Sequence, residues 1–216
     1  MEKLTLSTAY FPPISWFALA QKFGTAQIDA WETYVKQSYR NRFRMATSTG
    51  IIELSVPVKK PNGNKSKSNE IQIDYSQKWQ QQHWRSIQTA YQSAPFFLYY
   101  QDDIEELIST KYDSLLQMNT KIMEGMIDLL NIKLELSLTD DFLPIENDPN
   151  DFRFLIHPKK SSLLKQEAYF QVFDEKLGFI PDLSILDLLF NMGPESSLYL
   201  NNMTEEPSIN IMNTLQ

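Results

Sequence analysis

Along the N-terminal segment, the spacing of hydrophobic residues is first that of a strand, then that of a helix, and then that of a strand again. Residues 4–7 alternate apolar and polar side chains, as in a strand, and the prolines at 12–13 end this pattern. Over residues 14–23 the apolar side chains recur at helical spacing, and Gly24 stands where a left-handed helix cap is expected. Residues 26–31 have the pattern of a second strand. The order strand, helix, strand predicts a parallel βαβ unit.

The next segment predicts a hairpin and a polar loop. Two strand-like stretches, 42–46 and 51–58, flank a Thr-Ser-Thr-Gly turn. Pro57 indicates that the second strand lies at an edge or ends there, because proline has no amide for the ladder. Residues 59–69 are rich in lysine, asparagine and serine and predict a mobile loop.

The middle of the chain has helical periodicity. Ser76 can cap a helix that Pro95 ends. Asp102, followed three residues later by Glu105, resembles a capping box at the start of another helix. A longer helix is predicted over residues 113–131.

The C-terminal part mixes strands, an irregular segment and a short helix. Residues 134–138 alternate as in a half-exposed strand, and 169–173 are predicted to form another. Between them, residues 139–168 have no clean period and predict an irregular crossing segment. Ser184 is placed to cap an apolar helix over 185–192. Together the elements predict an α/β fold, with a mainly parallel sheet, flanking helices and an added β-hairpin.

Length and composition fit one globular unit. Of 216 residues, 42% are hydrophobic and 22% charged, a mixture that fills a core and excludes global disorder. We expect a single α/β domain over residues 1–202 and a frayed tail over 203–216. No apolar run approaches the roughly 18–20 residues that span a bilayer, and the N-terminus has no signal-peptide core. A cytoplasmic protein without membrane insertion is therefore expected.

Charge and cysteine content exclude several function classes. Lys and Arg number 20 against 27 Asp and Glu, for a net charge of −7, which disfavours nucleic-acid binding through the overall field. The absence of cysteine excludes disulfides, thiolate metal sites and thiol nucleophiles. Two histidines far apart in sequence form no metal signature, and the glycine-rich fingerprints of Walker loops and dinucleotide sites are absent, so neither a metal nor a cofactor is expected.

Cationic side chains form the first candidate site. Arg40, Arg42 and Arg44 are two residues apart, so a strand would align them on one face, suited to phosphate or carboxylate. The alternative is a solvated edge strand whose charges deter aggregation. The lysines of the loop 59–69 either close over an anionic ligand or only keep that loop soluble.

The turn after the first strand is the second candidate. It leads into a helix N-terminus, whose free amides can hold an anion. Tyr10 and Trp16 can stack on a base or sugar, while Pro12 fixes the loop. The alternative is a hydrophobic plug over the sheet.

Two further residues are candidates for proton transfer. His83 lies on the apolar face of its helix beside Trp79, where it is either a packed core histidine or a general base. Asp182 precedes the cap of the helix over 185–192, with no local bond that requires it, and is expected to face a crevice. Asp187 is expected to close the same cap together with Ser184, which makes its role local.

Several ordered motifs resemble the WbqC-like family. The turn Tyr10-Phe11-Pro12-Pro13-Ile14-Ser15-Trp16-Phe17 is similar to the family's Y-F-x-P-x-x-x-Y/W-F signature. Further matches are Asn41-Arg42, residues 54–58, residues 76–79 with His83, residues 90–97 and, most specifically, residues 179–191. Members often accompany O-antigen and other surface-polysaccharide genes.

The resemblance implies a transferase that modifies a nucleotide-activated or amino sugar. The implied ligand is a small molecule such as a nucleotide sugar. The expected substrate-binding residues are Tyr10, Pro12, Trp16, Arg40, Asn41 and Arg42, and His83 or Asp182 is expected to handle a proton. The alternative is a non-catalytic protein that binds a nucleotide sugar or scaffolds biosynthetic enzymes.

Overall fold

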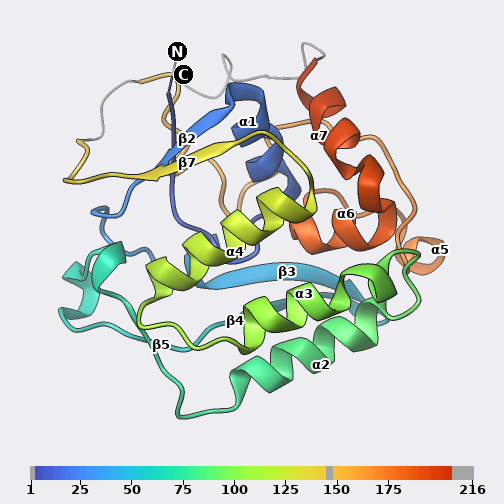
Figure 1. The fold of residues 1–216 in the computed structure, drawn as a ribbon, viewed down its shortest axis with the longest axis horizontal. Coiled ribbons are helices and arrows are strands. Elements are labelled where there is room, and N and C mark those ends of the chain that lie inside the picture. The colour runs from blue at the N-terminus through green and yellow to red at the C-terminus, as the bar shows by residue number, and fades with distance from the viewer. Residues whose placement is uncertain (1–2, 145–147, 206–216) are drawn as a thin grey trace.

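A small parallel sheet organises the fold. The computed structural model describes residues 3–144 and 148–205 (Figure 1). In the described part, β1 (Leu4–Leu6), β2 (Thr25–Ile28) and β7 (Glu135–Leu138) form a parallel sheet in the order β1-β2-β7. Leu4 is paired with Ala26, and Ala26 with Leu136. The predicted βαβ unit is therefore confirmed.

The crossover helix α1 (Ile14–Phe23) is buried along most of its length. Its apolar side chains face the sheet and the C-terminal helix α7 (Ser196–Glu205), which packs against it. Gly24 ends α1 with φ of 70°, and its amide donates to the carbonyls of Ala20 and Gln21. This is the predicted left-handed cap, a conformation that glycine adopts without steric penalty.

The hairpin is confirmed, but its second strand is shorter than predicted. β3 (Arg42–Thr47) pairs antiparallel with β4 (Gly50–Ser55). The chain then passes Pro57 and forms a second, two-stranded ladder from β5 (Val58–Lys59) and β6 (Gln72–Ile73). Proline has no amide to donate, which explains why the ladder is interrupted there.

The lysine-bearing segment 59–69 is not the free loop that was predicted. It contains 3₁₀ turns at Gly63–Lys65 and Ser68–Glu70. The amide of Ser68 donates to the carbonyl of Glu32, and the amide of Asn69 to that of Ala30. Backbone bonds therefore fix this loop against the chain that follows β2.

Three helices form the centre: α2 (Trp79–Tyr91), α3 (Phe97–Ser109) and α4 (Leu115–Leu129). Figure 1 shows α2 and α3 side by side, with α4 between them and the sheet in this view. Their starts differ from the predictions. α2 begins after Lys78 without a side-chain cap, and α3 begins before the acids expected to cap it. Ser114, not Asp113, caps α4 by accepting the amide of Gln117.

The C-terminal part is helical apart from its long irregular segment. It contains α5 (Asp174–Leu177), α6 (Ile185–Met192), a 3₁₀ turn at Gly193–Glu195, and α7. The described residues of 139–168, which exclude 145–147, are largely irregular, as predicted, whereas the strand predicted over 169–173 is wrong. Helix α7 continues to Glu205, beyond the expected start of a frayed tail, and residues 206–216 lie outside the described part.

A continuous core joins all these layers. Its largest fully buried side chains include Trp16, Trp79, Tyr10, Tyr91 and Phe43. The α/β class is confirmed, with a parallel sheet, flanking helices and an added hairpin, while the extent of the domain stays a prediction. Within the described residues, no helix has the length and apolar character needed to cross a membrane.

Candidate functional site

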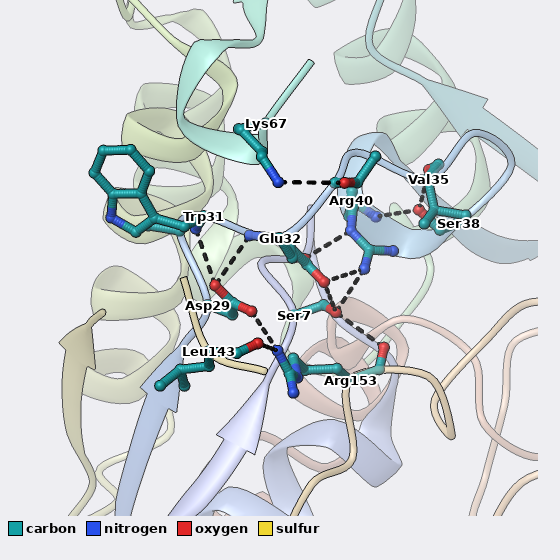
Figure 2. A network of polar contacts seen from close by, with 12 residues as sticks. Ser7, Asp29, Trp31, Glu32, Val35, Ser38, Arg40, Lys67, Leu143 and Arg153 are labelled. Atoms are coloured by element: carbon teal, nitrogen blue, oxygen red, sulfur yellow. Dashed lines mark hydrogen bonds and ion pairs between the residues drawn. The ribbon is translucent and has the colours of Figure 1, made fainter. Parts of the chain in front are cut away.

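Charged side chains are buried together at the carboxyl ends of β1 and β2. We define the charged network as Ser7, Asp29, Glu32, Arg40, Asp151 and Arg153, of which all but Asp151 are labelled in Figure 2. Ser7 directly follows β1 and Asp29 directly follows β2, so parallel pairing brings them to the same edge of the sheet. In open α/β sheets this edge is where ligands bind.

Arg153 is a structural clamp within the charged network. Its Nη1 donates to Asp29 Oδ2 and to the carbonyl of Leu143, and its Nη2 donates to Asp151 Oδ2 and to the carbonyl of Pro144. The Nε atom donates to both oxygens of Asp151. All donors are thus used, and the partners raise the pKa of the guanidinium. Sequence analysis missed Arg153, because it lies in a segment without periodicity.

Arg40 differs from Arg153 in having donors left over. Its Nε donates to Glu32 Oε1 at 2.8 Å, and its Nη2 donates to Glu32 Oε2 and to Ser7 Oγ. Nη1 donates no hydrogen bond to any described residue. Burial raises the pKa of Glu32, and the attraction of Arg40 opposes that rise. Glu32 therefore holds the guanidinium in place while one of its edges stays open.

A small cavity lies beside this open edge. Its walls come from the end of β1, the start of α1, the turn before β3 and the crossing segment; they include Ser7, Thr8, Trp16, Tyr39, Arg40 and Arg153. Its volume is about 10 Å³, which is close to the space that one water molecule needs. A ligand as large as a nucleotide sugar would therefore lie across the surface outside the cavity.

Cationic side chains lie near this cavity, whose wall includes Arg40 and Ile156, the residue before His157. We define the cationic rim as Arg40, Arg42, His157, Lys159 and Lys160. The pKa of His157 is lowered by burial and then by the positive charges of the other four. Of these, Lys159 donates to Gln37 Oε1 at 2.8 Å and Arg42 to Glu53 at 2.7 Å. Four positively charged side chains of an acidic protein therefore lie close enough to His157 to lower its pKa.

The arginine row predicted on one strand is only partly present. Arg42 and Arg44 lie on β3, but Arg40 belongs to the preceding 3₁₀ turn, Tyr39–Asn41, and is buried. Asn41, a predicted substrate contact, donates from Nδ2 to the carbonyl of Val56 and so fastens the base of the hairpin. Arg40 therefore does not align with Arg42 and Arg44, because the 3₁₀ turn directs its side chain toward the charged network.

Tyr10 and His83 lie in the core. The Tyr10 hydroxyl is 3.0 Å from His83 Nδ1, and the rings of Phe43 and Trp79 enclose the imidazole. Burial lowers the pKa of His83 to about 4, so this histidine is neutral near pH 7. Of the two alternatives that the sequence left open, the position matches the packed core histidine.

The remaining residues of the first turn are also covered by protein. Trp16 is 2% exposed, and its Nε1 donates to the carbonyl of Ser7. The Pro12 carbonyl accepts the amide of Ile185. Since stacking requires an open ring face, the arrangement matches the hydrophobic plug rather than the predicted stacking surface for Tyr10 and Trp16.

The anion site predicted at the start of α1 is filled by the protein's own carboxylate. Asp182 accepts the Ser15 amide at 2.9 Å and the Ser15 hydroxyl at 3.0 Å, and the Ile14 amide donates to the carbonyl of Leu183. Burial raises the pKa of Asp182, while the bonds from Ser15 oppose the rise. No local bond holds Asp182, but a long-range one does, since its carboxylate caps a helix from 167 positions away.

The local role predicted for Asp187 is also wrong. Its carboxylate accepts the hydroxyls of Tyr91 and Tyr169 and the Nε2 of Gln171. Burial raises its pKa to about 6, although these three bonds oppose the rise. Asp187 therefore joins α6 to α2 and to the segment that was predicted as a strand. Ser184 caps α6 as predicted, by accepting the amide of Leu186.

These features define an α/β protein with a charged network and a cationic rim at the carboxyl edge of a small parallel sheet. The chain belongs to the WbqC-like protein family, whose model matches residues 8–162. It is also 26% identical over 193 residues to Rv1507c, an uncharacterized protein of Mycobacterium tuberculosis, covering 77% of this chain and 83% of that protein. No solved structure matches the chain.

Proposed function

We propose that this protein is a transferase of surface-polysaccharide (O-antigen) biosynthesis that modifies a nucleotide-activated or amino sugar. The resemblance to a family often encoded beside polysaccharide genes supports the biosynthetic setting. A cytoplasmic location would give such an enzyme access to nucleotide sugars. The ligand would lie at the carboxyl edge of the parallel sheet.

The cationic rim is the observation that carries this proposal. A nucleotide sugar has negatively charged phosphates, and Arg and Lys side chains are the usual groups that bind them. The rim brings four Arg and Lys side chains near His157 in a protein whose net charge is −7. Its position beside the ends of β1 and β2 is also where ligands of open α/β sheets bind.

Arg40 and Arg42 are the predicted binding residues that this proposal retains. The guanidinium of Arg40 is oriented in advance by Glu32 and is 3% exposed, so its open edge would meet a phosphate oxygen through a water in the small cavity. Arg42 is partly exposed beside it, in a surface pair with Glu53. The predicted roles of Tyr10, Pro12, Trp16, Asn41, His83 and Asp182 are not needed here, since each has the structural contact described above.

A non-catalytic protein that binds a nucleotide sugar is the second candidate. One observation favours it: the acids of the charged network are all paired with arginine, Glu32 with Arg40, and Asp29 and Asp151 with Arg153. Both oxygens of each of these carboxylates already accept hydrogen bonds within the protein, which disfavours proton transfer from a substrate. The two candidates share the ligand and differ in turnover.

Calorimetric titration with UDP-, GDP- and dTDP-linked hexoses and amino sugars tests the proposal. The double variant Lys159→Ala/Lys160→Ala removes two exposed cations of the rim. Loss of charge-assisted contacts, at about 1.5–3 kcal/mol each, predicts at least a tenfold rise in Kd. Lys121→Ala/Lys133→Ala is the matched control: it removes the same charge, from exposed positions on α4 and just before β7, at the sheet's other end.

Two results would contradict the proposal. Equal affinity of both double variants would show that the rim does not hold the ligand. Failure of every nucleotide sugar to bind the unaltered protein would exclude the ligand class. If binding occurs, incubation with the bound sugar and candidate acceptors, followed by mass spectrometry, separates the transferase from the binding protein.

A further inference from the structure

We propose that Trp31, Phe142 and Lys67 form a subsite that stacks the nucleobase of a nucleoside diphosphate. We call these three residues the aromatic platform. The inference rests on the proposed function and names the part of the ligand that the cationic rim does not explain.

The platform presents aromatic rings to solvent. Trp31 is 37% and Phe142 50% exposed, whereas the other tryptophans, Trp16, Trp79 and Trp84, are 2–7% exposed. A large exposed aromatic side chain loses the stabilisation that burial would give it. Two of them beside a charged network mark a surface suited to a flat ligand.

A cation completes the platform. Lys67 Nζ lies 5.0 Å from the centroid of the Phe142 ring, within the range of a cation–π contact. The same Nζ donates to Thr33 Oγ1 at 3.5 Å. Lys67 thus links the loop that contains Trp31 and Thr33 to the Phe142 ring of the crossing segment. Its positive charge would lie near the phosphates of a base stacked on the platform.

The platform is held by the charged network. The amide of Trp31 donates to Asp29 Oδ1 at 2.9 Å. Arg153, which binds the other oxygen of Asp29, also donates to the carbonyl of Leu143, next to Phe142. A backbone bridge between Thr33 and Lys67 connects the segment that contains Trp31 to the segment that contains Lys67. Three segments far apart in sequence are therefore fixed relative to one another.

The layout fits the parts of a nucleoside diphosphate. Figure 2 shows Trp31 and Arg40 on opposite sides of Asp29 and Glu32. Any nucleobase can stack on an aromatic ring, and phosphates bind cationic side chains. A base on the platform would leave its diphosphate extending across the network toward the cationic rim.

Trp31 also provides the measurement. The full-length protein is titrated with UDP and GDP while tryptophan emission is recorded, and inorganic diphosphate and free glucose serve as partial probes. UDP and GDP are expected to quench the emission of the unaltered protein but not of Trp31→Phe, because the other tryptophans are buried. Trp31→Ala and Phe142→Ala should each raise the calorimetric Kd for UDP about fivefold or more and leave that for diphosphate unchanged.

Matched controls are available elsewhere on the surface. Phe170→Ala and Tyr99→Ala remove aromatic rings that are 54% and 76% exposed, away from the network, and should leave every Kd unchanged. Circular dichroism establishes that each variant is folded. Since Trp31 and Phe142 belong to different segments, failure of one variant to fold leaves the other as the test.

The outcomes separate the subsite from the function. Unchanged affinity of both platform variants for UDP would overturn the subsite and leave the proposed function standing. Quenching by free glucose equal to that by UDP would assign the platform to a sugar ring and overturn the nucleobase. If no nucleoside diphosphate or nucleotide sugar binds the unaltered protein, both proposals fail.

Discussion

Replacement of Asp182 by alanine removes the carboxylate that caps α1 from a distant part of the chain. The Ser15 amide and hydroxyl, 2.9 and 3.0 Å from its oxygens, would both lose their acceptor. A helix cap contributes about 0.5–2 kcal/mol, and a buried donor without a partner costs about 1–3 kcal/mol. Asp182 also has φ of 57°, a conformation that aspartate tolerates better than alanine. We expect Asp182→Ala to lower the free energy of unfolding by about 2–4 kcal/mol.

Asp182→Asn is the control for this variant. Asparagine keeps an acceptor for the Ser15 amide and tolerates the left-handed conformation, so we expect it to cost less than about 1 kcal/mol. Urea unfolding followed by circular dichroism measures both values, with equal m-values required for the comparison. A loss below about 0.5 kcal/mol for alanine, or equal losses for the two variants, would refute the capping role.

Three other changes have defined outcomes. Burial raises the pKa of Asp187 in the folded protein to about 6, from 3.8 for an exposed carboxyl group. The stability that protonated Asp187 contributes is therefore full below pH 3.8 and is lost as pH rises through 6. The free energy of unfolding of Asp187→Asn should therefore rise relative to that of the unaltered protein, by up to about 3 kcal/mol between pH 4 and 7. Urea unfolding at several pH values measures this difference, and a difference that does not change with pH would argue against the reasoning. Arg40→Ala leaves Glu32 buried without its partner and should lower the free energy of unfolding by about 3–5 kcal/mol. Arg42→Ala breaks a surface pair and should lower it by under about 1 kcal/mol, so similar losses for the two variants would contradict the difference in burial. Leu186→Ala, at a fully buried position of α6, should lower the free energy of unfolding by about 2–5 kcal/mol, and a loss under 1 kcal/mol would mean that the core collapses around it.

Local signals in the sequence predicted the elements that local chemistry determines. Gly24 ends α1 because glycine takes a left-handed φ, and Ser184 caps α6 because its hydroxyl reaches an amide two residues on. The hairpin was equally predictable, since alternation and the turn at 47–50 are both short-range. The predicted row of arginines was only partly right, because Arg42 and Arg44 lie on β3 whereas the turn before this strand buries Arg40.

Long-range contacts explain the failures. Residues 169–173 were predicted to form a strand, but the side chains of Tyr169 and Gln171 bind Asp187, so their spacing serves a buried carboxylate. The start of α1 looked open to an anion because its acceptor, Asp182, comes from the far end of the chain. Arg153 gave no signal, since a clamp that binds distant carbonyls and carboxylates leaves no periodic pattern.

The pairing of the two helix starts has a consequence for synthesis on the ribosome. The Ile14 amide donates to the carbonyl of Leu183, and the Ile185 amide donates to the carbonyl of Pro12. The residues just before each helix therefore accept the first amide of the other helix. A nascent chain that has emerged only as far as β7 has every strand of the parallel sheet but not the acceptors for α1. The first turn of α1 in the βαβ unit is therefore complete only after residues 182–183 have been synthesised. Folding that depends on contacts between such distant positions is slow and leaves apolar surface exposed in the meantime.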